Sequence, residues 1–307
     1  MSGVRVDAEL VRRGQARSRR HAAELVGAGR VRVGGRVVTK PSVTVAATDD
    51  LVVAADPGDA GYASRAAVKL AGALDALAAD GAGRALAAAV PGAWCLDLGA
   101  STGGFTDVLL RRGARHVVAL DVGHDQLVPW LREDERVTVV EGFNVRDLVP
   151  GDLERAPDLL VGDLSFISLT LVVGPAARVL PTGAPALLLV KPQFEVGRER
   201  LGSGGVVRDP ELHVRAVGAV VDAADRVGLA ARAVVPSPLP GPSGNREYFV
   251  WFERRPDLRG DGGVTGARDA AEPAVRAAVG WAPDAAGAQV PPVLAVPATT
   301  VVPGGAQ

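Results

Sequence analysis

The chain has 307 residues, a formal net charge of −1 and 48% hydrophobic residues. A chain of this length buries a large core and is typical of two domains, and its near-neutral charge excludes a uniformly basic nucleic-acid coat. Its one cysteine excludes an internal disulfide and a cysteine-built metal centre. The four histidines lack the spacing of metal ligands, so no metal site is expected.

The charge is unevenly distributed along the chain. Residues 1–40 hold ten Arg and Lys against three acids, an excess of +7. This segment has no apolar run of the kind that a signal peptide contains, and the longest apolar stretches, such as residues 186–190, are too short to cross a membrane. We therefore expect a soluble cytoplasmic protein with no membrane partner.

Residues 5–55 predict a small, independent α+β unit. Gly34 and Gly35 lie between two alternating apolar stretches, which is the pattern of a tight hairpin turn. The expected elements are helices over residues 6–13 and 19–28, a hairpin over residues 31–38 and a strand over residues 51–53.

Arginines are concentrated in this first unit, and guanidinium groups suit bidentate contacts with phosphate. A solvated basic face is the alternative interpretation. Because the unit has almost no aromatic residues, we expect it to recognise the shape and backbone of folded RNA rather than to stack on bases. The arginines expected to contact RNA are Arg5, Arg12, Arg13, Arg17, Arg19, Arg20, Arg30 and Arg32, with Arg36 on the hairpin.

A Gly-, Pro- and Asp-rich segment over residues 56–61 indicates a domain boundary. We expect an RNA-binding domain over residues 1–59, a catalytic domain over residues 60–255 and a largely disordered extension over residues 256–307. Within that extension, a short helix is expected over residues 271–279.

From residue 94 onward strands and helices alternate, which predicts an α/β fold with a parallel sheet covered on both faces. Two late strands have no helix between them and are expected to form an antiparallel pair at one sheet edge. The expected strands are 94–98, 116–121, 136–140, 158–162, 186–191, 232–235 and 248–252, and the expected helices are 64–77, 104–112, 124–132, 168–180 and 210–227.

A glycine-rich turn follows the first of these strands, and an acid, Asp121, ends the second. The glycines allow the backbone to approach a ligand closely, and the carboxylate can accept hydrogen bonds from ribose hydroxyls. The chain contains neither Gly-x-Gly-x-x-Gly nor Gly-Lys-Ser/Thr, so S-adenosylmethionine fits better than a dinucleotide or a nucleoside triphosphate. An ordinary βαβ unit with packing glycines is the alternative. The expected cofactor-binding residues are Asp97, Gly99, Ala100, Ser101, Gly103, Gly104, Phe105, Asp121 and Asn144.

Four polar residues stand among apolar neighbours in the order Lys69, Asp163, Lys191 and Glu247. Each alone is compatible with a structural role, but the ordered set is far more specific. In open α/β sheets, ligands lie beyond the carboxyl ends of the strands, which is where Asp163 and Lys191 fall.

These segments resemble a known family. Residues 5–11, 18–22 and 29–35 are similar to the S4-like RNA-binding domain, and the Lys-Asp-Lys-Glu order is similar to that of FtsJ-type ribose 2′-O-methyltransferases. The combination resembles the TlyA family, some members of which are called hemolysins. The matching segments of the second domain are Ser64-Arg65-x-x-x-Lys69-Leu70, Asp97-x-Gly99 to Phe105, Asp163–Leu169, Val190–Gly197 and Ser237–Phe249.

The resemblance implies a Rossmann-like methyltransferase fold with a mostly parallel seven-stranded sheet, S-adenosylmethionine as cofactor, and cytidine 2′-hydroxyls of 16S and/or 23S rRNA in ribosomal subunits as substrate. It implies Lys69, Asp163, Lys191 and Glu247 as catalytic residues. The chemistry of methyl transfer to a hydroxyl agrees with this interpretation, because a neutral Lys191 can accept the hydroxyl proton. A neighbouring cation, Lys69, and partial burial both favour a neutral amine.

Other interpretations remain open. An RNA-binding protein with an inactive methyltransferase fold requires a broken tetrad, and a pseudouridine synthase requires neither the glycine turn nor the tetrad. A small-molecule methyltransferase does not need the basic first unit. A membrane-lytic protein requires an apolar amphipathic segment that the sequence does not show.

Overall fold

The structure is a computed structural model that describes residues 3–16, 19–54, 60–241, 243–255, 266–282 and 290–297. Contacts divide the chain into two compact units, Met1–Ser64 and Arg65–Gln307. No helix in the described ranges is long and apolar enough to span a bilayer.

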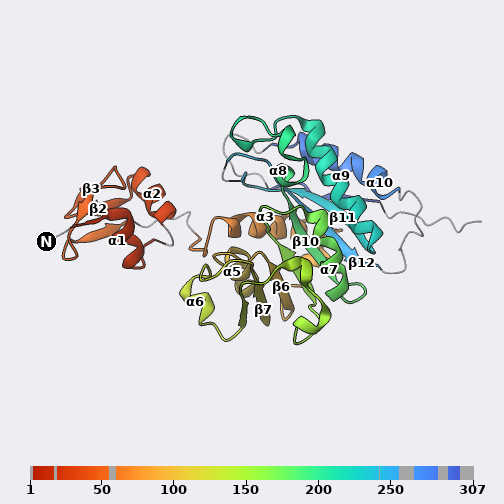
Figure 1. Cartoon of the computed structure of the whole chain (residues 1–307), viewed down its shortest axis with the longest axis horizontal. Helices are drawn as coiled ribbons and strands as arrows, with labels where there is room; N and C mark the ends of the chain where they lie inside the picture. The colour runs from red at the N-terminus through yellow and green to blue at the C-terminus, as the bar shows by residue number, and fades with distance from the viewer. Residues whose placement is uncertain are drawn as a thin grey trace, which may run out of the picture. The chain divides into compact units, whose positions relative to one another are not determined.

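The first unit combines two short helices with small antiparallel sheets (Figure 1, red and orange). The predicted helices and the hairpin are confirmed. Gly34 and Gly35 have φ values of +54° and +80°, which a two-residue hairpin turn requires. The elements are β1 (Val4–Arg5), α1 (Val6–Arg12), α2 (Arg19–Gly27), β2 (Val31–Val33), β3 (Arg36–Val37), β4 (Thr44–Val45) and β5 (Leu51–Val53).

This unit has a core of its own. The buried residues come from one face of each helix and from the three-stranded sheet β3-β2-β5. These side chains pack against one another within the unit. The core residues are Val6, Leu10, Ala16, Ala22, Leu25, Val26, Val31, Val38, Val45 and Leu51.

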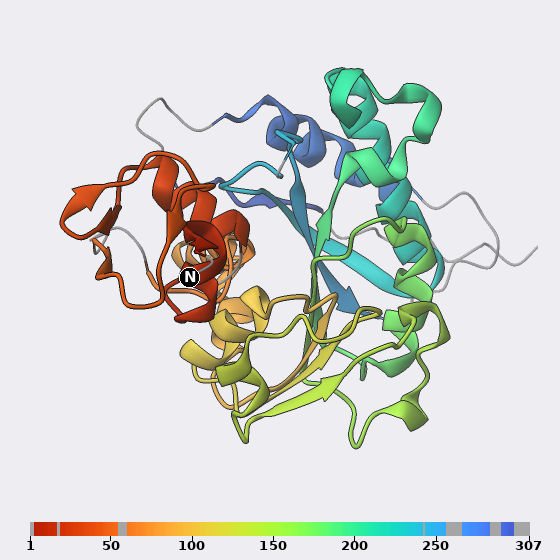
Figure 2. The same cartoon turned by 60° about the vertical axis from the view of Figure 1, so that its left-hand side comes forward.

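The second unit is built on a sheet with the order β13-β11-β12-β10-β9-β6-β7-β8 (Figures 1 and 2). The five strands from β10 to β8 run parallel, and β12, β11 and β13 add antiparallel. The predicted late antiparallel pair is confirmed as β11 and β12. The strands are β6 (Trp94–Leu98), β7 (His116–Leu120), β8 (Val137–Val140), β9 (Leu159–Gly162), β10 (Pro185–Val190), β11 (Leu229–Pro236), β12 (Tyr248–Arg254) and β13 (Leu294–Ala295).

The sheet is apolar on both faces, as expected for parallel strands covered by helices. Alternate residues such as Leu96, Leu188 and Val250 belong to one core cluster with helices α7, α9 and α10. The residues between them, such as Leu189 and Phe249, are also fully buried and point to the opposite face, because side chains alternate along a strand. Phe249 stacks against Phe105 of helix α5, so that opposite face is the one that α5 covers.

The helices of this unit form two groups. α3 contacts α4 and α5, whereas α9 contacts α7, α8 and α10. Figure 2 shows α9 and α10 side by side (green-blue and blue). The helices are α3 (Ala66–Ala79), α4 (Arg84–Ala88), α5 (Gly104–Arg111), α6 (Pro129–Arg132), α7 (Val173–Val179), α8 (Pro192–Glu195), α9 (Pro210–Arg226) and α10 (Ala267–Gly280).

Two predicted helices are shorter in the structure. The helix predicted over residues 124–132 begins only at Pro129, which sits in the first turn where its missing N–H is harmless, and Asp125 before it has a φ of +54°. The helix predicted over residues 168–180 breaks into a 3₁₀ turn (Leu169–Leu171) and α7. Pro175 has no N–H to donate to the carbonyl of residue 171, so the α-helix does not extend backward.

The prediction of a largely disordered extension is wrong for its described residues. Helix α10 is longer than the predicted helix, and its apolar face, including Ala271 and Val275, is buried against α9. The two-residue strand β13 pairs with β11, which makes eight strands in the described sheet where seven were expected. The helix predicted over residues 271–279 is therefore confirmed, whereas its packing on α9 and the strand β13 were not predicted.

The burial of α10 can be tested at Val275, whose exposure is 1%. We expect Val275→Ala to lower the free energy of unfolding by about 1–2 kcal/mol, because it removes buried methyl groups and leaves a small cavity. Urea denaturation measures the change. The control is Val122→Ala, at a side chain that is 69% exposed, with an expected change below about 0.5 kcal/mol. Equal effects of the two substitutions would show that α10 is not packed.

Candidate active site

The four tetrad residues share one face of the sheet. Asp163, Lys191 and Glu247 continue the strand alternation of Val161, Leu189 and Phe249, which point toward the α5 face. Lys69 reaches this face from α3, which packs on α5. The fold therefore gathers side chains that lie far apart in the sequence at the carboxyl ends of β9 and β10.

Lys69 and Glu247 form a buried ion pair. Lys69 Nζ donates to Glu247 Oε2 at 2.5 Å, and the two side chains are 6% and 1% exposed. The other oxygen, Oε1, is buried without a hydrogen-bond partner and lies against Gly241, where a Cβ would approach it to 2.5 Å. Gly241 is therefore the residue that leaves room for this carboxylate.

Lys191 lies between a carboxylate and a hydroxyl. Its Nζ is 2.7 Å from Asp163 Oδ1 and donates a hydrogen bond to Ser165 Oγ at 2.7 Å. The contact with Asp163 is an ion pair whose angles do not make a directed hydrogen bond, and Oδ1 is otherwise without a partner. The amine is thus held at one end of β10 with its side chain 9% exposed.

The two ion pairs are neighbours across the sheet. Val190 of β10 is directly opposite Tyr248 of β12 in the antiparallel register. Lys191 follows Val190 and Glu247 precedes Tyr248, so the two residues lie at the same end of this strand pair. Each lysine consequently has its own carboxylate. Ser165 was not predicted, although it lies within the Asp163–Leu169 segment.

The glycine turn is anchored to the ends of two strands beside β6. Gly99 N and Ala100 N donate to Leu120 O at 2.8 and 3.2 Å, and Asp163 N donates to Leu98 O at 3.0 Å. Gly99 has a φ of +80°, and a Cβ there would come within 3.0 Å of the Asp163 carbonyl oxygen. Only glycine allows this close approach, so the turn and the tetrad residue Asp163 lie side by side.

Gly103 also has a backbone conformation and a close contact that favour glycine. Its φ is +94°, and a Cβ would lie 2.3 Å from Leu131 Cδ1. Gly104 then begins α5, so the turn leads directly into a helix amino-terminus, while Ala100 is buried and Ser101 is exposed with a φ of +47°.

Asp121 organises the turn from the end of β7. Its Oδ2 accepts from Ser101 N at 2.8 Å and its Oδ1 accepts from Gly123 N at 2.7 Å. A carboxylate has about four acceptor positions, so both oxygens keep capacity for further donors. The residue predicted to receive ribose hydroxyls is therefore fixed in place by the turn.

Asp97 is fully buried beneath this turn. Thr106 Oγ1 donates to its Oδ2 at 2.7 Å, and its Oδ1 has no partner. Burial raises the pKa of the Asp97 carboxyl to about 7, the Thr106 hydrogen bond opposes this, and the charge of Asp163 adds to it. An acceptor oxygen that is buried without a partner among the described residues is an exception in folded proteins, and its place next to the glycine turn favours a ligand-binding cradle there.

Two other residues predicted to bind the cofactor have structural partners. Phe105 is 2% exposed and its ring lies 5.9 Å from that of Phe249, so it is part of the core. Asn144 follows β8 and caps the 3₁₀ turn Val145–Asp147, with its Oδ1 accepting from Arg146 N at 3.1 Å.

An exposed aromatic side chain lies beside the tetrad and was not singled out from the sequence. Phe166 is 92% exposed and has a φ of +64°, an unusual backbone conformation for a bulky residue. Its ring lies 5.3 Å from that of Phe194, which in turn is 5.9 Å from Lys191 Nζ. The signal that identifies Phe166 is an aromatic residue three positions after the strand-end acid Asp163.

The arginines of the first unit divide into two kinds. Arg5 and Arg19 pair with Asp7, and Arg12 pairs with Glu9, yet these three guanidinium side chains stay 52%, 60% and 62% exposed. The arginines hold the pKa of both carboxyls at about 2, Arg5 acting most on Asp7 and Arg12 most on Glu9.

Of the other arginines of that unit, three bind its own backbone and two have side chains outside the described residues. Arg13 is 21% exposed and donates to Asp49 O and Ala47 O at 2.9 and 2.8 Å, so it is chiefly structural. Arg30 donates to Ala54 O and Arg32 to Gly35 O. Arg17 and the side chain of Arg20 lie outside the described residues.

Two family models match this chain. The FtsJ-like methyltransferase model covers residues 62–254, and the S4 domain model covers residues 4–51. These matches confirm the resemblance that the sequence motifs predicted.

Several known proteins are similar over most of their length. A Mycobacterium tuberculosis protein named 16S/23S rRNA (cytidine-2′-O)-methyltransferase TlyA is 52% identical over 83% of this chain and 91% of its own length. Hemolysin A of Brachyspira hyodysenteriae is 36% identical over 81% of this chain and 99% of its own length. A solved structure of a Streptococcus thermophilus protein described as a hemolysin superposes with a TM-score of 0.66 at 34% identity, covering 91% of this chain and 96% of that one.

The burial of Asp97 predicts a pH dependence of stability. A raised pKa means that the folded protein keeps the proton where the unfolded chain, with an ordinary value of 3.8, has lost it. The stabilising contribution of the neutral carboxyl is complete below that ordinary value and is lost as the pH rises through about 7. The variant Asp97→Asn has an amide that does not titrate. We therefore expect the free energy of unfolding of the variant, relative to that of the wild type, to increase between about pH 5 and about pH 8.

Urea denaturation of the two proteins at a series of pH values measures this difference. The control is Asp125→Asn, at an exposed residue that keeps its backbone conformation as asparagine. Parallel curves for wild type and Asp97→Asn would contradict the buried, protonated carboxyl.

Proposed function

The chain belongs to the FtsJ-like methyltransferase family, and we propose that it methylates the 2′-hydroxyl of cytidine in 16S or 23S rRNA within ribosomal subunits, with S-adenosylmethionine as methyl donor. The observation that carries this proposal is the pair of neighbouring ion pairs, Lys69–Glu247 and Lys191–Asp163, beside the glycine turn. The relative named for this reaction is 52% identical over nearly its whole length.

The cradle beside β6 fits the cofactor. Gly99 and Gly103 give the turn its positive-φ shape, Asp121 presents a fixed carboxylate, and Asp97 has a buried oxygen without a partner among the described residues. These residues would hold S-adenosylmethionine, which supplies an activated methyl group when bound. Ser101, Ala100 and Gly104 belong to the same turn.

Lys191 is the residue placed to move the proton. The 2′-oxygen of the ribose forms a bond to the methyl carbon as the bond from that carbon to sulfur breaks, and the hydroxyl proton must leave. A neutral Nζ of Lys191 accepts it, and Asp163 and Ser165 orient the amine. The remaining rate gain comes from holding the hydroxyl and the methyl group in line.

Lys69 and Glu247 support this site from α3 and β12. Their pair is almost fully removed from water, and each group neutralises the other. A lysine held in this way stays fixed relative to Lys191, because its partner Glu247 precedes the residue paired with Val190. We infer that Lys69 contacts the ribose side of the substrate.

Relatives that carry the name hemolysin share this architecture. The intact tetrad nevertheless favours methyl transfer over both lysis and RNA binding without catalysis. Buried ion pairs contribute little net stability compared with apolar packing, so two of them at one strand end indicate a chemical use.

Lys191→Ala tests the role of the proton acceptor. We expect methyl transfer to fall by at least about 10²-fold, because the variant lacks the amine, while the affinity for S-adenosylmethionine stays within about twofold. The assay incubates 30S and 50S subunits that lack the modification with methyl-labelled cofactor and measures label that resists alkali at one cytidine. Cofactor affinity is measured by calorimetry.

The control for Lys191→Ala is Lys40→Ala, which changes an exposed lysine of the first unit. It is expected to keep turnover at saturating subunit concentration. Normal turnover by folded Lys191→Ala would exclude Lys191 as the proton acceptor, and an absence of label in both subunits with the wild type would exclude the proposed reaction.

Phe166 is expected to stack on a base of the bound RNA. An exposed ring held beside Lys191 offers a face on which an unstacked base near the target can rest. Phe166→Ala should lower kcat/KM for the subunit by about 10-fold or more, since one base–aromatic stack contributes about 1–3 kcal/mol. Phe166→Tyr should retain most of the rate, and Trp130→Ala, at a 49% exposed ring of α6, serves as the control. Equal kinetics for Phe166→Ala and wild type would refute the stacking.

A further inference from the structure

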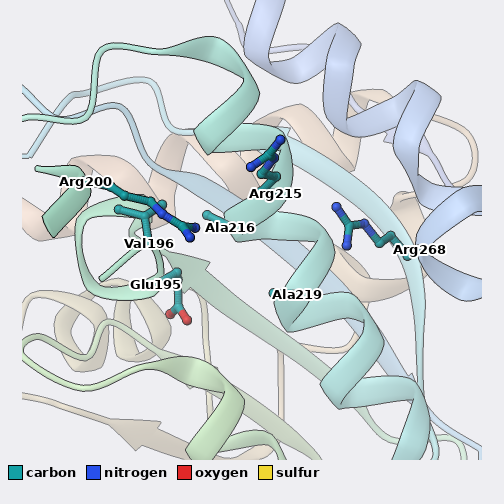
Figure 3. A pocket seen from close by; sticks show the side chains of 7 residues that line it. All are labelled: Glu195, Val196, Arg200, Arg215, Ala216, Ala219 and Arg268. Atoms are coloured by element: carbon teal, nitrogen blue, oxygen red, sulfur yellow. The ribbon is translucent and has the colours of Figure 1, made fainter. Parts of the chain in front are cut away.

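Three arginines from separate segments line a pocket of about 510 Å³ at the exposed side of α9 (Figure 3). Arg215 is on α9, Arg268 is on α10, and Arg200 is in the turn that follows α8. Small or apolar residues, Val196, Ala216 and Ala219, leave the space between them open. The result is a hollow with a strongly positive lining.

The positive charge of this pocket is poorly compensated. In the described ranges, neither Arg215 nor Arg268 forms an ion pair within 4.0 Å, although the charge of Asp222 on α9 acts on Arg268, and Arg200 reaches only the exposed Glu199 at 3.7 Å. The acid one turn before Arg215 is Glu211, and both of its oxygens accept from Arg276 at 2.6 and 3.0 Å. Like charges gathered without carboxylate partners are stable where an anion joins them.

The position of Arg268 is built into the packing of α10 on α9. Its side chain crosses α9 at Gly218, where a Cβ would lie 3.0 Å from Nε and 3.2 Å from Cγ. Because glycine is unfavourable within a helix, its presence in the middle of α9 indicates that the space is used. Arg268 is half-buried there, so the packing restricts the position of its guanidinium group.

The one acid that lines the pocket is turned away. Glu195 Oε2 accepts from Ser168 Oγ at 2.5 Å and Oε1 accepts from Leu169 N at 2.8 Å. Figure 3 shows its carboxylate pointing away from the three guanidinium groups. Glu195 therefore does not neutralise the arginines.

We propose that this pocket binds a backbone phosphate of the RNA substrate, on the catalytic unit itself. The proposal rests on the RNA substrate proposed above. Guanidinium groups bind phosphate oxygens through paired, charge-assisted hydrogen bonds, and contacts of this kind set the register of a protein on its nucleic acid.

The location suits a phosphate close to the modified nucleotide. Glu195 and Val196 line the pocket and follow Lys191 by four and five residues, through the single turn of α8. One such turn advances about 6 Å along the helix axis. Lys191 points to the α5 face whereas the pocket lies beside α9, so a phosphate held here anchors the strand beyond the end of β10, about one turn of chain from the residue proposed to accept the proton.

The test is the double variant Arg215→Gln with Arg268→Gln, in the full chain. Affinity for purified 30S and 50S subunits is measured by filter binding at several salt concentrations. We expect affinity to fall about 10-fold or more and the slope of log K against log salt to decrease in magnitude by about 1, as for the loss of one phosphate contact. Turnover at saturating subunit concentration and the affinity for S-adenosylmethionine should not change.

The matched control is Arg226→Gln, at an exposed arginine on the same helix about 16 Å from Arg215. Unchanged affinity and slope in the double variant would overturn the proposal, and so would an equal loss in the control, since it would show only a diffuse charge effect. Loss of inorganic phosphate binding without loss of subunit affinity would also overturn it, in favour of a small anion.

Failure of the proposed function is distinguishable from failure of this inference. Wild-type protein that binds subunits without methylating them would refute the methylation, while the comparison of affinities and salt slopes would still decide the role of the pocket. Thermal unfolding of the double variant verifies that it is folded.

Discussion

The catalytic unit depends on the ion pair between Lys69 and Glu247. Removing two charges from water is unfavourable, and breaking such a pair by losing one partner costs about 3–5 kcal/mol. The pair ties α3, which precedes the sheet in the sequence, to β12, which is inserted late between β10 and β11. It therefore constrains how the antiparallel strands meet the parallel ones. The absence of a Cβ at Gly241 leaves room for the Glu247 carboxylate. The register of Val190 with Tyr248 places Glu247 at the end of β10.

A second constraint operates at the other side of the same strand ends. Gly99 brings the cofactor turn against the backbone of Asp163, and Asp163 pairs with Lys191. Asp163 thus belongs both to the wall of the proposed cofactor cradle and to the pair proposed to accept the proton. The strand order explains this double role of Asp163. The chain first forms β7 and β8 on one side of β6, and β9 then pairs with β6 on the other side. Ligand sites of open α/β sheets lie at such reversals.

Much of this was predictable from local patterns. The glycines of the turn, the acid that ends β7 and the four tetrad residues stand out because polar or flexible residues interrupt apolar strands. The arginine pocket did not stand out, since Arg200, Arg215 and Arg268 come from three segments whose contact depends on the packing of α10 on α9. The helix within the extension was predicted over residues 271–279, but its greater length and its burial against α9 were not, for a related reason. Pro273 weakens the local helix signal, and the stability of α10 comes from tertiary burial of Val275 and its neighbours rather than from propensity.

The sequence separation of Lys69 and Glu247 also determines when the buried ion pair can form during translation. Glu247 is synthesised 178 residues after Lys69. At about 5–20 residues per second, roughly 10–40 s separate the two residues as they leave the ribosome. The first unit, whose core closes within residues 6–51, can fold throughout that interval. Lys69 stays in water until β12 is added, so the nascent protein acquires its RNA-binding surface well before it becomes a catalyst.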